Sequence, residues 1–174
     1  MTRAQVDFAT LSLRDALDLA ILIEEEAEER YEELAHQLEG HRTPEAARFF
    51  RTMIANEAKH RRRLSERRGH LFAAAPCTVT RAMLWDVEAP DYDEARAFMT
   101  PRQAMQTALG CEEKAHAFFV AALPTLVDPE VRALFEELRD EEVQHQAMIR
   151  EQLVGLPPDS DVVAEDFGDE PVSH

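Results

Sequence analysis

The sequence predicts an all-α protein built as a four-helix bundle. Three observations support this class: helix-forming residues dominate, only five of the 174 residues are glycines, and capping residues divide the chain into four long helical stretches. With 45% apolar residues, a chain of this length can bury a substantial core in a single domain.

Capping residues mark where the first two helices begin and end. Ser12 is expected to cap the first helix, which ends at Gly40. The second helix is expected to open with Thr43 and Pro44, a cap followed by proline at the first helical position, and to end near Gly69.

The third and fourth helices carry the same signals. Thr100 and Pro101 are expected to open the third helix, which ends before Pro124. The fourth helix is expected to begin at Asp128, again with proline after the cap, and to end near Gly155.

A long connection joins the second and third helices. Residues 70–99 can return along the whole bundle, so we expect these two helices to run parallel in an up-down-down-up path. A short helix is expected after Asp91, and Trp85 is expected to pin the connection to the bundle.

The chain repeats itself. The bundle is expected to span residues 1–155 as two helical hairpins, 12–69 and 100–155, followed by an acidic disordered tail over 156–174. The fourth helix repeats the second at an offset of 85, and the third repeats the first at an offset of 88. The polar residues that coincide at these offsets are Glu57 with Glu142, His60 with His145, and Glu24 with Glu112.

Each helix has an inward seam of apolar residues spaced three and four apart, which is typical of antiparallel bundles. The seams are interrupted by polar residues only near the middle, at Glu24, Glu57, His60, Glu112, Glu142 and His145. Four carboxylates and two imidazoles would then meet in a dry core, where unpaired burial costs several kcal/mol each. Two divalent cations would balance the four carboxylates.

The ligand types favour particular metals. Carboxylates with one imidazole per ion suit iron or manganese, whereas calcium rejects imidazole and structural zinc prefers thiolates. One glutamate from each of two helices, with Glu-x-x-His from each of the others, is the pattern of carboxylate-bridged two-metal sites. The sequence therefore predicts two iron ions, with manganese or mixed occupancy as alternatives.

These motifs resemble the di-iron domain of rubrerythrins and bacterioferritins, in the ferritin-like superfamily, over roughly residues 10–154. The resemblance rests on Glu24 to Tyr31, the pairs Glu57/His60 and Glu142/His145, and Glu112 to Phe119. It implies that Glu57 and Glu142 bridge both irons, that Glu24 and His60 complete one, and that Glu112 and His145 complete the other. It also implies that Tyr31 lies beside the site.

Two departures from that family bear on function. Rubrerythrins carry a further carboxylate one turn after the ligand of the third helix, where this chain has Ala115. They usually also carry a four-cysteine rubredoxin domain, whereas this chain has only Cys77 and Cys111. Electrons are therefore expected from a separate donor or from substrate iron.

The expected function is that of a non-haem di-iron oxidoreductase, of peroxidase or ferroxidase type, that reacts with hydrogen peroxide or dioxygen. One alternative is an iron-binding or storage protein without a separate organic substrate, and another is a metal-free structural bundle. The long connection also permits exchange of hairpins between chains, so a homodimer is expected.

Charge and composition exclude other classes. The formal charge of -16, from 35 acidic and 19 basic residues, would repel nucleic acid and anionic membranes. No apolar run approaches the length of a membrane span, and two cysteines do not make a disulfide framework. A cytoplasmic location is expected.

Four residues near the expected ligands have alternative interpretations. The Tyr31 phenol either hydrogen-bonds a ligand carboxylate or has a redox role. Asn56 and Glu141 each precede the glutamate of a Glu-x-x-His pair, where the side chain is either exposed or orients an imidazole of the facing helix. His116 lies one turn beyond Glu112 and off the seam, so it is expected to be partly exposed; the alternative is that it turns toward the metals.

Overall fold

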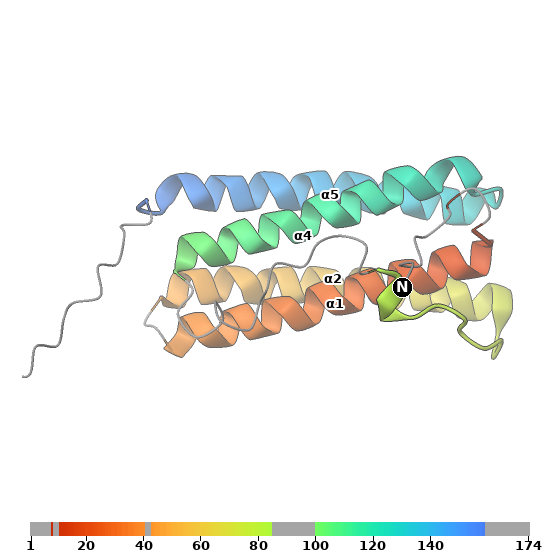
Figure 1. Ribbon diagram of the computed structural model, residues 1–174, viewed down its shortest axis with the longest axis horizontal. Helices are drawn as coiled ribbons and strands as arrows, with labels where there is room; N and C mark the ends of the chain where they lie inside the picture. Colours follow the sequence, from red (N-terminus) through yellow and green to blue (C-terminus); the bar gives the residue numbers. More distant parts are fainter. Residues whose placement is uncertain (1–7, 9–10, 41–42, 85–99, 159–174) are drawn as a thin grey trace, which may run out of the picture.

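The computed structural model describes residue 8 and residues 11–40, 43–84 and 100–158 (Figure 1). The expected helix after Asp91, the anchoring role of Trp85 and nearly all of the expected tail lie outside these residues.

The described residues form four long helices, joined by loops and two short 3-10 turns, and contain no strand. The long helices are α1 (Leu13–Gly40), α2 (Pro44–Phe72), α4 (Pro101–Ala122) and α5 (Pro129–Gly155), and the turns are η1 (Arg81–Met83) and η3 (Leu123–Thr125). Following the colours of Figure 1, α1 and α5 run one way while α2 and α4 run the other. The predicted all-α, ferritin-like, up-down-down-up bundle is confirmed.

Neighbouring helices are antiparallel throughout. α1 contacts α2 and α4, and α5 contacts α4 and α2, so the parallel pairs lie on the diagonals. The closest backbone approach is within the hairpins α1–α2 and α4–α5. The two hairpins are therefore the more closely packed units of the bundle.

Most predicted helix ends have the expected capping contacts. Asp128 accepts hydrogen bonds from the backbone N–H of residues 130 and 131, and Thr100 forms a capping box with Gln103. Two expectations for α2 were wrong in detail. Thr43 makes no side-chain cap, because its hydroxyl donates to the Leu38 carbonyl instead. The helix also continues past Gly69 to Phe72.

The end of α2 is set by Ala73 and Arg68 instead of by glycine. Ala73 adopts a positive φ of 47°, and its backbone N–H donates to the Gly69 carbonyl. The Arg68 guanidinium donates to the carbonyls of Ala73 and Ala75 and contacts the buried carboxylate of Asp18 on α1. These contacts fix the start of the connection against the first hairpin.

Replacing Asp128 with alanine is expected to lower the free energy of unfolding by about 1 kcal/mol, because two backbone donors of α5 lose their acceptor. A urea titration followed by circular dichroism measures the change. Asp128→Asn keeps a capping oxygen and is expected to stay close to wild type. Equal losses in both variants would show that charge, and not capping, is the contribution of Asp128.

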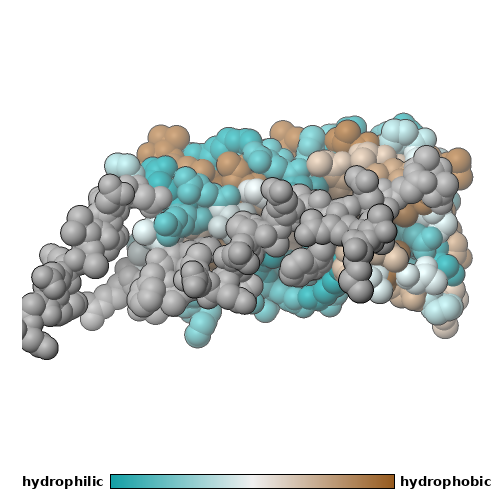
Figure 2. All heavy atoms as spheres, viewed as in Figure 1, coloured by the Kyte–Doolittle hydropathy of each residue, from teal (hydrophilic) through white to brown (hydrophobic). Residues whose placement is uncertain are grey.

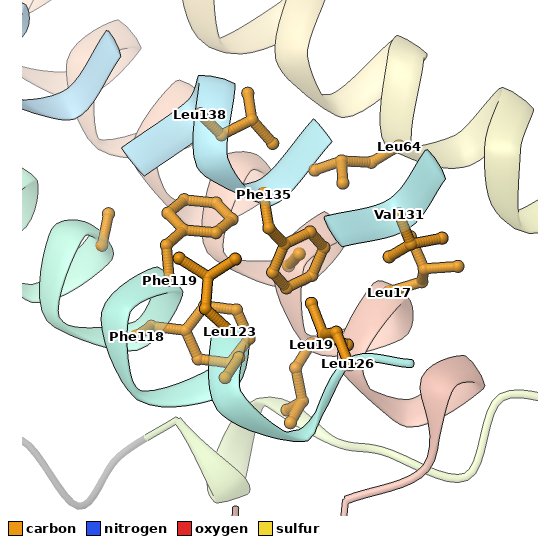
Figure 3. Close-up of a cluster of buried hydrophobic side chains, with 14 residues drawn as sticks. Leu17, Leu19, Leu64, Phe118, Phe119, Leu123, Leu126, Val131, Phe135 and Leu138 are labelled. Atoms are coloured by element: carbon orange, nitrogen blue, oxygen red, sulfur yellow. The ribbon is translucent and has the colours of Figure 1, made fainter. Parts of the chain in front are cut away.

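Two apolar clusters fill the bundle, one toward each end. The Phe119 cluster lies where α4 leads into α5, and Figure 3 shows Phe119 and Phe135 facing each other within it, with ring centroids 5.2 Å apart. The Phe50 cluster lies toward the other end and contains Tyr31, Met53, Met105 and Ile149. The polar seam positions lie between the clusters along every helix.

The predicted seams are almost fully buried. Besides the six polar residues, the seams consist of Leu17, Ala20, Ala27, Tyr31, Leu34 and Leu38 on α1, Ala46, Phe50, Met53 and Leu64 on α2, Met105, Ala108, Ala115, Phe119 and Ala122 on α4, and Val131, Phe135, Leu138 and Ile149 on α5. All of these residues are buried except Ala27, which is half-buried and packs against the Phe50 cluster. Figure 2 shows mostly hydrophilic residues over the visible middle of the bundle, with hydrophobic ones gathered along one edge and at one end. Among the described helices, none is both long and apolar enough to span a membrane.

Candidate metal centre

The structure brings together all six side chains that the seams single out. They come from α1, α2, α4 and α5, and each is 5% exposed or less: Glu24, Glu57, His60, Glu112, Glu142 and His145. Their placement follows from helix geometry, because a residue in the middle of an inward seam must face the other helices.

One group gathers around His60. Glu24, Glu57, His60 and Glu142 each offer a ligand atom, and these atoms all lie within 4.8 Å of one another. The ring nitrogen Nδ1 of His60 lies 3.5 Å from a Glu24 oxygen and 3.4 Å from a Glu57 oxygen. Three helices therefore contribute to this group.

A second group gathers around His145. Glu57, Glu112 and His145 offer ligand atoms within the same 4.8 Å limit. Nδ1 of His145 lies 3.0 Å from Glu112, 3.3 Å from Glu57 and 3.8 Å from Glu142. The carboxylate of Glu57 belongs to both groups, as a bridging residue must, and the two imidazole rings stack with centroids 5.5 Å apart.

Several atoms of the cluster are buried without a hydrogen bond. They are Oε1 of Glu24, Oε1 of Glu57, Oε1 of Glu142 and Nδ1 of His60. Buried polar atoms of native proteins are normally satisfied, so this concentration of lone pairs in one place indicates a missing partner. Carboxylate oxygens and imidazole nitrogens are the donor set that iron and manganese take, and the residues present therefore fit such ions.

Burial and mutual repulsion change the acidity of these groups. Burial raises the pKa of Glu24 and of Glu142 well above the usual value, and it raises the pKa of Glu112 to about 7. Burial also acts to raise the pKa of Glu57, but the close contacts of its carboxylate with His60, Glu24 and His145 together outweigh burial and lower that pKa. For His60, burial acts to lower the pKa, but the neighbouring carboxylates of Glu57, Glu141 and Glu142 together outweigh burial and raise that pKa. The raised pKa values show that the burial of these carboxylates is costly unless their charge is neutralised.

Tyr31 lies against this cluster. Its side chain is fully buried, its hydroxyl donates to Oε1 of Glu112, and its ring stacks on Phe50. Of the two interpretations of Tyr31, the hydrogen bond to an expected ligand is therefore present in the structure.

Replacing Tyr31 with phenylalanine is expected to destabilise the metal-free protein by about 1–3 kcal/mol, because a buried carboxylate loses its donor. Urea unfolding measures this loss. Metal content per chain is expected to stay unchanged, since the phenol orients Glu112 and is not itself an expected ligand. A fall in bound metal would show instead that Tyr31 coordinates an ion.

Asn56 and Glu141 both face imidazoles of the opposite helix. Oε2 of Glu141 lies 2.6 Å from Nε2 of His60, and Nδ2 of Asn56 lies 3.5 Å from Nε2 of His145. Both side chains are half-buried, so plain surface exposure, the other interpretation of these two residues, does not describe them.

Other residues near the cluster behave differently. His116 is half-buried, in agreement with its position off the seam, and Ala115 packs into the Phe119 cluster. Sequence reasoning missed Gln146, which is buried and whose amide donates to the Glu112 backbone carbonyl at 3.3 Å. The only sequence feature that could have identified Gln146 is its position directly after His145. The seam pattern, however, places that position at the edge of the helix and not in the interior.

Comparisons with known proteins agree with this architecture. Residues 15–153 match the family model described as Rubrerythrin. The chain is similar to a solved structure from Magnetospirillum magnetotacticum MS-1, described as an uncharacterized conserved protein, with 29% identity and a TM-score of 0.73 over 86% of this chain and 98% of that one. A hypothetical protein from Pyrococcus furiosus has the same fold, with 21% identity and a TM-score of 0.61 over 84% and 90% of the two chains. No curated protein matches the chain.

Proposed function

The chain belongs to the rubrerythrin family, and from this premise we propose that it is a di-iron oxidoreductase that reacts with hydrogen peroxide or dioxygen. The observation that carries the proposal is the layer of four buried glutamates and two histidines between two apolar clusters. In the absence of cations, four buried atoms of this layer that could bind a metal, three carboxylate oxygens and one imidazole nitrogen, have no hydrogen-bond partner.

Two ions fit the donor set better than one. Glu24 and His60 lie on one side, Glu112 and His145 lie on the other, and Glu57 offers an oxygen to each. In this arrangement Glu57 and Glu142 would bridge the ions, as the family resemblance implies. Iron is the metal we propose, and manganese would accept the same ligands.

When bound, a pair of ferrous ions supplies the two electrons that reduce hydrogen peroxide to water. The chain's own residues hold the reacting region dry and aligned. The Phe119 and Phe50 clusters exclude water along the bundle axis, one on each side of the polar cluster. The Tyr31 hydroxyl donates a hydrogen bond to Glu112. A separate electron donor is part of the proposal.

Stopped-flow mixing of the ferrous-loaded protein with hydrogen peroxide, and separately with dioxygen, tests the proposed activity. Oxidation is expected to be faster than that of free ferrous iron in the same buffer. Glu112→Ala is expected to abolish the difference, whereas Glu113→Ala, an exposed neighbour on α4, is expected to retain it.

The same experiment separates the proposal from iron binding or storage. A protein that binds about two irons per chain yet oxidises them no faster than buffer would be a binding protein and not an oxidoreductase. Sedimentation measures the number of subunits in the assembly. Storage needs a closed shell of many subunits, whereas we propose a homodimer.

A further inference from the structure

The two imidazoles of the cluster have different outer partners. Asn56 and Glu141 occupy the same position of the internal repeat, each directly before the glutamate of a Glu-x-x-His pair. Each side chain reaches across to the other hairpin, Glu141 to His60 and Asn56 to His145. One imidazole therefore faces a carboxylate, and its counterpart faces a neutral amide.

Both rings are oriented in the same way. Nδ1 of His60 and Nδ1 of His145 face the cluster carboxylates, and Nε2 of each ring points toward its outer partner. An imidazole that binds an ion through Nδ1 carries its proton on Nε2 and needs an acceptor there. The identity of that acceptor controls how strongly the ring donates to the ion.

Glu141 is a strong acceptor for this purpose. Its Oε2 is buried, lies 2.6 Å from Nε2 of His60, and makes no aligned hydrogen bond in the structure, so a small rotation of ring or carboxylate would complete one. A carboxylate can only accept, and its negative charge makes the imidazole a stronger ligand.

Asn56 is a weaker acceptor. Its amide nitrogen is the atom that faces Nε2 of His145, at the long distance of 3.5 Å. To accept from Nε2–H the amide must turn so that Oδ1 faces the ring, and the side chain remains neutral after it does.

We propose that Glu141 and Asn56 are positioning residues that make the two metal positions unequal, with the tighter position beside His60. This inference rests on the proposed metal centre. The first ion to bind therefore occupies the His60 position, and the centre loads in a fixed order.

Titration of the metal-free wild-type chain with Co²⁺, followed by calorimetry and visible absorption, tests the inference. Two binding steps are expected. Glu141→Gln, which removes the charge and keeps the shape, is expected to weaken the tighter step by about 10- to 100-fold and to leave the other step in place. Asn56→Asp is expected to strengthen the weaker step, so that the two affinities converge.

Glu151→Gln, an exposed position further along α5, is the matched control and is expected to bind like wild type. A purely structural role for Glu141 would lower stability to urea without changing the ratio of the two affinities. Equal weakening of both steps, or an unchanged isotherm, in Glu141→Gln would overturn the inference while leaving the metal centre standing. If that variant does not fold, an unchanged affinity ratio in Asn56→Asp overturns it. A wild-type chain that binds no Co²⁺ would overturn the metal centre itself.

Discussion

Replacing Glu57 with alanine is expected to reduce bound iron from about two ions per chain to nearly none. Glu57 is the only residue common to both groups of candidate ligands among the described residues, so its loss removes an oxygen from each ion at once. Losing the orienting partner of a ligand already costs about 10- to 100-fold in metal affinity, and losing a shared ligand is expected to cost more. Elemental analysis of the reconstituted, desalted protein measures the change.

The neighbouring residues supply graded controls for this result. Glu24→Ala and Glu112→Ala each remove a ligand from one group only, so about one ion per chain is expected to remain in each variant. Glu66→Ala, on an exposed part of α2, is expected to retain both ions. If Glu57→Ala retained one ion as firmly as the single-group variants do, Glu57 would not bridge.

The inward seams account for how much of the site was predictable from sequence. A residue such as Glu112 could be singled out from Glu113 because only the former continues the spacing of Met105 and Ala108. The internal repeat then provided an independent check, since Glu24 falls at the matching place on α1. Periodicity and repetition are properties of the sequence, so both can be recognised before the structure is known.

What the sequence could not supply depends on competition between local contacts. The hydroxyl of Thr43 could either cap α2 or donate to the Leu38 carbonyl. Which hydrogen bond forms depends on how the two helices of the hairpin pack. Gly69 is a residue type that often ends a helix. Here α2 continues past it, and the hydrogen bonds of Arg68 to the carbonyls of Ala73 and Ala75 hold the chain just after the helix end. Asp18 lies off the seam and is buried because Arg68 of the facing helix meets it.

The acidity of the cluster predicts an unusual pH dependence for the metal-free protein. Burial raises the pKa of Glu112 from 4.5 to about 7, so the folded chain holds this proton more tightly than the unfolded chain does. The resulting stabilisation is complete at low pH and disappears as pH rises from about 4.5 through 7. The raised pKa values of Glu24, Glu142 and His60 act in the same direction, whereas the lowered pKa of Glu57 matters only in more acidic solution.

Glu112 alone is therefore expected to cost the metal-free protein on the order of 3 kcal/mol of stability between pH 5 and pH 8, or roughly 6–12 °C in melting temperature. The metal-loaded protein is expected to show the opposite trend, because ions compete with the same protons and bind more tightly as pH rises. Thermal melts at both pH values, with and without a chelator, measure the two slopes. Glu112→Gln, which cannot ionise, is expected to reduce the slope of the metal-free form without abolishing it, since Glu24, Glu142 and His60 still contribute. A metal-free wild type that grows more stable toward pH 8 would show that the four carboxylates do not share the dry interior described here.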